Sequence, residues 1–117
     1  FMRILSPAFV RRFKGRILNI HPSLLPAYKG AHAVRDAWAD GAKVTGVTVH
    51  LVTEALDSGP VILQAALPVG EKDTEKILEA GIHRLEHKLY PKAVRLLAEG
   101  RLKLDGRRVR IQKKKRR

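Results

Sequence analysis

The chain has 117 residues, 44% of them apolar, which is enough for one domain with a packed core. The absence of cysteine excludes disulfides and thiolate metal sites. An aromatic content of 5% argues against a base-stacking surface, even though the net charge is +13. No apolar run approaches the ~20 residues that cross a bilayer and no signal peptide is recognised, so we expect a cytoplasmic protein without a membrane partner.

The first part of the chain predicts a short helix followed by a buried strand. Ser6-Pro7 is typical of a helix start, and we expect the helix to continue to about Phe13. Residues 16–21 are mostly apolar with β-branched members, which favours a strand, and Pro22 ends it. Pro22 and Pro26 then bound a loop of limited flexibility.

The middle of the chain alternates between helical and strand patterns. Residues 31–40 place apolar side chains on one side at helical spacing, which predicts a helix. Residues 44–53 alternate between an apolar and a partly polar face, and residues 61–67 are a second apolar strand. Turn-forming residues over 56–60 separate the two strands. This order of elements predicts an α/β layered architecture.

The last third predicts a long helix and a small hairpin. Residues 73–99 carry leucine and isoleucine at helical spacing, and we expect Pro91 to kink or divide this helix. Residues 102–111 fit a hairpin around Asp105-Gly106.

Positive charge is concentrated at the end of the chain. Residues 101–117 hold ten basic residues against one acid, a charge of +9, which leaves +4 of the total +13 for the first hundred residues. A block of like charges is usually solvated and disordered, so residues 112–117 are interpreted as a basic disordered tail. A nucleic-acid-binding arm is the less favoured alternative, because no recognised binding motif accompanies the block.

Three polar residues form the candidate site. Asn19 and His21 are two apart on a predicted strand, so their side chains point the same way at its carboxyl end, where open α/β sheets bind ligands. Asp57 lies in a turn and could orient and charge His21. An amide donor, a cationic donor and a base are the parts that acyl transfer to an amine needs. Simpler roles, a loop-capping hydrogen bond for the pair and an Asx turn for the aspartate, remain open.

Other catalytic chemistries fit the sequence less well. The serines lack the context of a nucleophile elbow and cysteine is absent, so direct transfer is favoured over an acyl-enzyme. The five histidines show no metal-binding spacing apart from His83 and His87, and that spacing on a helix more often marks a solvated face. We therefore expect no metal.

Two segments resemble the signatures of enzymes that use 10-formyltetrahydrofolate. They are Asn19-Ile20-His21-Pro22-Ser23-Leu24-Leu25-Pro26 and Leu56-Asp57-Ser58-Gly59-Pro60-Val61-Ile62. Residues 1–6, 49–53 and 86–91 further resemble the branch of this formyltransferase family that formylates glycinamide ribonucleotide in purine synthesis. The resemblance extends from Phe1 to about Ile111 and implies formyl transfer from 10-formyltetrahydrofolate as co-substrate.

The resemblance also implies roles for individual residues. Asn19, His21 and Asp57 match the catalytic residues of the family. The folate pocket is expected to be lined by Met2, Arg3, Ile4, Leu5, Thr53 and Glu54. Glu86 matches a residue that contacts glycinamide ribonucleotide, and support for the site is expected from His32, Thr48 and His50. For His50, the role of an ordinary strand histidine is an equal alternative.

The fold implied by the resemblance is part of a Rossmann-like formyltransferase domain with a mostly parallel central sheet and its amino-terminal half missing. Residues 1–111 would be the carboxyl-terminal, catalytic part of that domain, and the basic tail would follow. Since phenylalanine does not start a translated chain, we expect residues upstream of Phe1. The missing half would carry the glycine-rich phosphate loop, so this chain alone is predicted to be weakly active or inactive, and pairing with another chain is expected.

Two alternative functions follow from the charge. The first is formylation of a different amine such as methionyl-tRNA, because a +9 tail would suit an RNA. The second is a basic nucleic-acid-binding module, for which affinity would fall steeply with salt.

Overall fold

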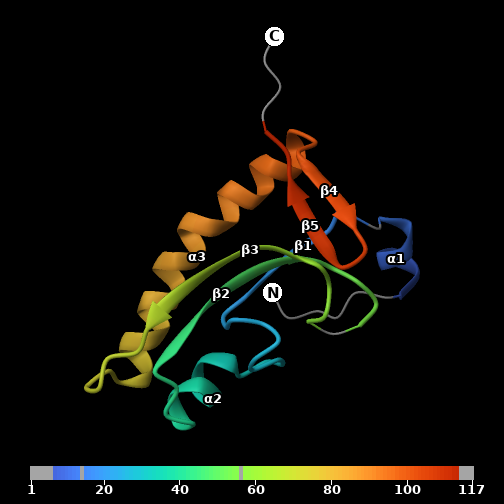
Figure 1. The fold of residues 1–117 in the computed structure, drawn as a ribbon. Helices are drawn as coiled ribbons and strands as arrows, with labels where there is room; N and C mark the ends of the chain where they lie inside the picture. The colour runs from blue at the N-terminus through green and yellow to red at the C-terminus, as the bar shows by residue number, and fades with distance from the viewer. Residues whose placement is uncertain (1–6, 14, 56, 114–117) are drawn as a thin grey trace.

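The computed structural model describes residues 7–13, 15–55 and 57–113. Its elements, labelled in Figure 1, are α1 (Pro7–Arg12), β1 (Leu18–His21), α2 (Ala33–Ala39), β2 (Val44–Leu51), β3 (Val61–Pro68), α3 (Glu75–Ala98), β4 (Leu102–Asp105) and β5 (Arg108–Ile111). Each predicted helix and strand is present within a few residues of its expected bounds. In the described part of the chain, no helix is both long enough and apolar enough to span a membrane.

The central sheet has the order β1-β2-β3, and both of its pairings are antiparallel. The prediction of a mostly parallel sheet is therefore wrong for the described residues. Only residues 52–60 connect β2 to β3, which is too short for the crossover that a parallel pair needs. The longer connection from β1 to β2 contains α2, but the chain returns along β1 instead of crossing over. Alternation of helices and strands predicted the elements but not their direction.

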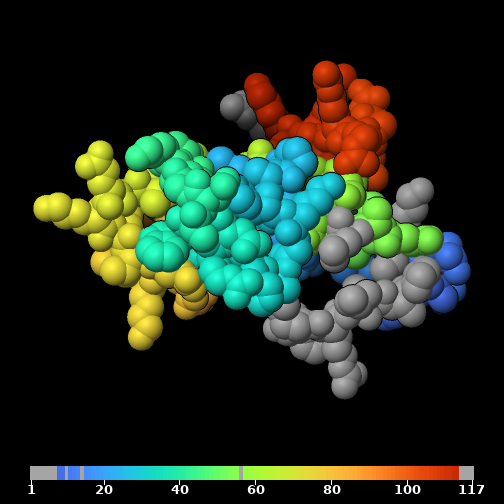
Figure 2. All heavy atoms as spheres, turned by 90° about the horizontal axis from the view of Figure 1, so that it is seen from below, coloured from blue at the N-terminus to red at the C-terminus, as the bar shows by residue number. Residues whose placement is uncertain are grey.

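The two faces of β2 have different neighbours. One face is buried against α3 in two clusters, Val47 with Leu78 and Ile82, and Val49 and Leu51 with Ala93 and Leu96. Thr48 and His50 alternate with these residues and point to the opposite face. Figure 2 shows the segment 22–40, which includes α2, lying over the sheet. The side chains of His21 and Thr48 are therefore enclosed between the sheet and the loop that follows β1, whereas Asn19 is exposed.

The helix α3 is continuous through Pro91. Of the two predicted effects of Pro91, division of the helix is wrong and a kink stays a prediction. Ala93 and Leu96, which follow the proline, are buried in the core and hold the last turns in place. Thr74 caps the amino end, where its side-chain oxygen accepts a hydrogen bond from the Ile77 amide at 3.2 Å.

The β4–β5 hairpin turns at Gly106, whose φ of +61° favours glycine. Leu102 and Val109 pack against the core residues between α3 and the sheet, so this hairpin belongs to the same domain. The predicted disordered tail, 112–117, falls mostly outside the described residues and stays a prediction.

Candidate active site

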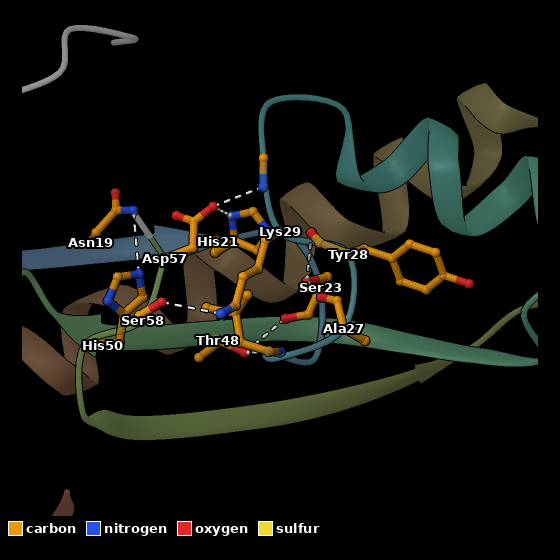
Figure 3. A network of polar contacts seen from close by, with 12 residues as sticks. Asn19, His21, Ser23, Ala27, Tyr28, Lys29, Thr48, His50, Asp57 and Ser58 are labelled. Atoms are coloured by element: carbon orange, nitrogen blue, oxygen red, sulfur yellow. Dashed lines mark hydrogen bonds and ion pairs between the residues drawn. The ribbon is translucent and has the colours of Figure 1, made fainter. Parts of the chain in front are cut away.

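His21, the last residue of β1, is 4% exposed, and both of its ring nitrogens face oxygen atoms. Nε2 lies 2.8 Å from the carbonyl oxygen of Tyr28, and Nδ1 lies 3.7 Å from Oδ2 of Asp57. A carbonyl oxygen only accepts hydrogen bonds, so Nε2 carries a proton. The Nδ1–Oδ2 separation is longer than a hydrogen bond, so the pair is a close contact between the ring and the carboxylate. Figure 3 shows the Asp57 carboxylate beside the His21 ring.

Asp57 approaches His21 from the loop between β2 and β3. Its Oδ2 also accepts a hydrogen bond from the backbone amide of Gly30 at 2.8 Å, and its side chain is only 8% exposed. The backbone of Asp57 is left-handed, with φ of +49°, a conformation that aspartate tolerates better than most residues. The backbone of Gly59 packs closely against the backbone of Leu51, since a β-carbon at Gly59 would lie 1.6 Å from the Leu51 carbonyl oxygen. This turn therefore has a specific backbone path that directs the carboxylate at His21.

Asn19 lies on the same face of β1 but is more exposed, and it contacts His50 rather than His21. His50 Nδ1 lies 3.0 Å from the carbonyl oxygen of Leu51, so Nδ1 carries the proton and Nε2 is left to accept. The Asn19 amide nitrogen lies 3.5 Å from that Nε2, across the β1–β2 pairing that places the two residues opposite each other. His50 thus orients the amide of Asn19. In Figure 3, the side chains of Asn19, Asp57 and His21 lie along the same side of β1.

Thr48 holds the loop that carries the site. Its hydroxyl donates to the carbonyl oxygen of Ser23 at 2.7 Å, and it accepts from the amide of Leu25 at 3.1 Å and from Nε2 of Gln64 at 3.0 Å. Gln64 also donates to the Leu25 carbonyl oxygen at 2.9 Å. Ser23 in turn donates to the carbonyl oxygen of Ala27 at 2.5 Å. The loop between β1 and α2 is therefore fixed to β2 and β3, and it presents the Tyr28 carbonyl to His21.

The Tyr28 side chain is anchored as well. Its hydroxyl donates to Oδ2 of Asp40 at 2.5 Å, and this hydrogen bond, with a smaller contribution from desolvation, raises the pKa of the phenol above its ordinary value. The Tyr28 backbone is left-handed, with φ of +53°. A bulky residue rarely adopts this conformation unless its surroundings impose it. The bond to Asp40, just after α2, is one such constraint.

Comparisons with known proteins identify the family to which the chain belongs. The family model described as Formyl transferase matches residues 1–94. The chain belongs to the formyl transferase family. It is 51% identical over 116 residues to the phosphoribosylglycinamide formyltransferase of Escherichia coli strain K12, covering 93% of this chain and 55% of that protein.

Solved structures of family members superpose closely on the described fold. The crystal structure of glycinamide ribonucleotide transformylase 1 from Symbiobacterium toebii has a TM-score of 0.93 and 54% identity, over 97% of this chain and 53% of that one. A formyltetrahydrofolate deformylase from Pseudomonas syringae pv. tomato has a TM-score of 0.92 and 30% identity, over 97% of this chain and 38% of that one. The family predicted from the sequence is thus confirmed, and the chain spans about half the length of the relatives it matches.

In this member of the formyl transferase family, several predicted site residues lie outside the group of contacts around His21 and Asp57. Thr53 and Glu54 follow β2, where Thr53 donates to the Ala55 carbonyl oxygen at 3.3 Å and Glu54 pairs with Arg11 at 3.3 Å. His32 is exposed and lines a hollow of about 220 Å³ that also contacts Pro22, Glu75 and Glu79. The predicted folate residues Met2, Arg3, Ile4 and Leu5 lie outside the described residues.

Glu86 lies on α3, the helix that covers the face of the sheet opposite to Asn19 and His21. Its carboxylate is 4.0 Å from Nε2 of His83, and its predicted contact with the nucleotide stays a prediction. Among the described residues, no group of three or more histidine, cysteine, aspartate or glutamate side chains could hold a metal ion.

Sequence reasoning missed several groups that touch the site. The Tyr28 carbonyl and the Gly30 amide hold His21 and Asp57, respectively. Both are backbone groups, for which the side-chain pattern carries no signal. Gly30, with φ of +99°, was detectable only as a flexible loop residue. Lys29 and Ser58 are also joined, at 3.1 Å, between two loops that are distant in the sequence.

Proposed function

We propose that this chain carries the catalytic groups for transfer of a formyl group from 10-formyltetrahydrofolate to the amine of glycinamide ribonucleotide, a step of purine synthesis. The observation that supports this most directly is the buried His21–Asp57 pair with the Asn19 amide on the same strand face. Relatives about 50% identical bear the names of enzymes for this reaction. The three sequence segments specific to this branch support the same substrate.

In the proposed reaction, the amine attacks the formyl carbon directly. A new carbon–nitrogen bond forms, the carbonyl oxygen becomes an oxyanion, and the bond to the folate nitrogen then breaks. The Asn19 amide donates a hydrogen bond to the oxyanion, and His21 donates a second one through Nδ1, which lies 3.7 Å from Asp57, while Nε2 keeps its contact with the Tyr28 carbonyl oxygen. Asp57 keeps His21 charged and oriented. The proton that the attacking amine loses balances the one that the departing folate nitrogen gains, and we assign Asp57 and His21 to that exchange.

We also propose that a further segment of polypeptide completes the domain. The chain spans about half of its relatives' length. Since the resemblance places a glycine-rich phosphate loop ahead of the segments found in this chain, we propose that the chain forms the carboxyl-terminal part of the domain. The other part would supply the phosphate site of the nucleotide and the parallel strands, which are absent from the described residues of this chain. Glu86 and the residues proposed to bind folate would complete the site only in that assembly. This chain by itself is therefore proposed to have low or no activity.

The test measures formylated nucleotide by mass spectrometry. The chain would be incubated with both substrates, with and without a polypeptide carrying the first half of the Escherichia coli relative. We expect transfer mainly in the mixture. His21→Gln should lower the rate by roughly 10²–10³-fold, the usual loss for one group that stabilises an oxyanion. Asp57→Asn should lower it by about 10²–10⁴-fold, the usual contribution of a group that transfers a proton.

The matched control is His87→Ala, which removes an exposed histidine from α3 and should leave the rate unchanged. Full activity of the His21 or Asp57 variant would overturn the proposed roles. Hydrolysis of the formyl donor without an acceptor, or formylation of methionyl-tRNA in place of the nucleotide, would overturn the proposed substrate.

A further inference from the structure

Two cationic side chains from distant parts of the chain contact Ser58, the residue directly after Asp57. Lys29 Nζ donates to the Ser58 hydroxyl at 3.1 Å from the loop after β1. Arg107 Nη2 donates to the Ser58 carbonyl oxygen at 2.5 Å from the turn of the β4–β5 hairpin. In Figure 1 this turn lies beside the loop that joins β2 and β3. The chain between Asp57 and Gly59 is thus held from two sides.

The conformation of Asp57 requires such support. Left-handed backbone, with φ of +49° at Asp57, is unfavourable for a non-glycine residue and persists where the surroundings enforce it. Gly59 fixes the following part of the turn against the Leu51 carbonyl oxygen. On the Asp57 side, the described contacts are the Gly30 amide and His21, so the direction of the carboxylate depends on where Ser58 is held.

The hairpin is well suited to hold Arg107 in place. Leu102 and Val109 pack in the core between α3 and the sheet. At the end of α3, the backbone amide of Arg101 donates to the Leu96 carbonyl oxygen at 3.0 Å, which joins the hairpin to the helix. The backbone amide of Gln112 donates to the Arg101 carbonyl oxygen at 2.7 Å, which joins the two ends of the hairpin. Both ends of the hairpin are therefore tied to each other and to α3, and its turn presents the guanidinium at a defined position.

We propose that Arg107 and Lys29 are positioning residues for formyl transfer, which hold Ser58 and thereby direct the Asp57 carboxylate at His21. This inference rests on the proposed function for its catalytic consequence but not for its geometry. Neither cation acts on the substrate in this proposal. Charge-assisted hydrogen bonds are stronger than neutral ones, so two of them on one residue are sufficient to constrain the turn.

The first experiment compares steady-state rates in the reconstituted transfer assay. Arg107→Ala should lower kcat roughly tenfold with little change in KM for either substrate, because misplacing a reacting group by ~1 Å costs about 10²-fold and Arg107 acts one residue away. Arg107→Lys should recover part of the loss. Because both cations act through Ser58, the double variant of Lys29→Met and Arg107→Ala should lose less than the product of the two single losses.

The control is Arg108→Ala, which removes the same charge from the neighbouring position of the hairpin. Both side chains are exposed, but among the described contacts Arg107 donates to Ser58 and Arg108 does not. It should leave kcat unchanged. If Arg107→Ala and Arg108→Ala have equal kcat values, or if the loss appears in KM alone, the positioning role is refuted.

The second experiment needs no activity. Nuclear magnetic resonance on the 117-residue chain would follow hydrogen exchange of the Gly30 amide, which donates to Asp57. Arg107→Ala and Lys29→Met should each accelerate this exchange roughly tenfold, as loss of about one hydrogen bond's stabilisation implies. Arg108→Ala should not. Unchanged exchange in the first two variants refutes the positioning role. If exchange is accelerated but the chain shows no transfer activity under any condition, the positioning role stands and the proposed function is refuted.

Discussion

Replacing Thr48 with valine tests how strongly the site loop is bound to the sheet. Valine keeps the shape and β-branching of threonine but has no hydroxyl, so the strand should keep its conformation. Thr48 is fully buried, and its hydroxyl is bonded to the Ser23 carbonyl oxygen and the Leu25 amide, which are buried as well. The substitution therefore removes a partner from two backbone groups that have no access to water.

The expected cost follows from those groups. A buried donor or acceptor without a partner costs about 1–3 kcal/mol, and removing the buried hydroxyl itself recovers part of that. The free energy of unfolding should therefore fall by about 2–4 kcal/mol. For a domain of this size the loss corresponds to a decrease in Tm of about 8–16 °C. Gln64 retains its bond to the Leu25 carbonyl oxygen, which limits the loss.

The assay is urea denaturation followed by circular dichroism, with Thr45→Val as the matched control. Thr45 lies on the same strand and is 2% exposed, but its hydroxyl has no hydrogen-bond partner among the described residues. Valine at Thr45 should be neutral or stabilising, because it removes a buried polar group without a partner. If Thr48→Val destabilises the chain no more than Thr45→Val does, the hydroxyl does not hold the loop and the reasoning fails.

Two further substitutions test the surroundings of the site. Gly59→Ala would place a β-carbon 1.6 Å from the Leu51 carbonyl oxygen, so we expect loss of the folded state or a cost of at least about 3 kcal/mol, measured by the same urea titration; a wild-type midpoint would contradict the close approach. Asp40→Asn removes the negative acceptor of the Tyr28 hydroxyl and should lower the raised pKa of that phenol toward its ordinary value of 10.0 in a spectrophotometric titration. Since that pKa is raised in the folded state, the bond stabilises the fold below about pH 10, and the stabilisation disappears as the pH rises through the folded value. An unchanged titration curve would show that Asp40 does not control the phenol.

Sequence reasoning predicted local structure well where a single physical rule dominates. The strand ending at His21 follows from the proline after it, and α3 follows from leucines at helical spacing capped by Thr74. It failed where packing outweighs a local rule. Pro91 removes one helical hydrogen bond, yet burial of Ala93 and Leu96 keeps α3 intact. The antiparallel direction of β2 was likewise not encoded in its alternating pattern.

The same division applies to the candidate site. The sequence by itself determined that Asn19 and His21 share one face of a strand, because side chains alternate strictly along β structure, and that Asp57 lies in a turn. Only the tertiary structure decided that Asp57 meets His21, that Asn19 contacts His50, and that Arg107 reaches Ser58. Each of these contacts joins residues more than 30 positions apart. The backbone amide and carbonyl groups that orient the side chains are common to nearly all residues, so their role depends on where the folded chain places them.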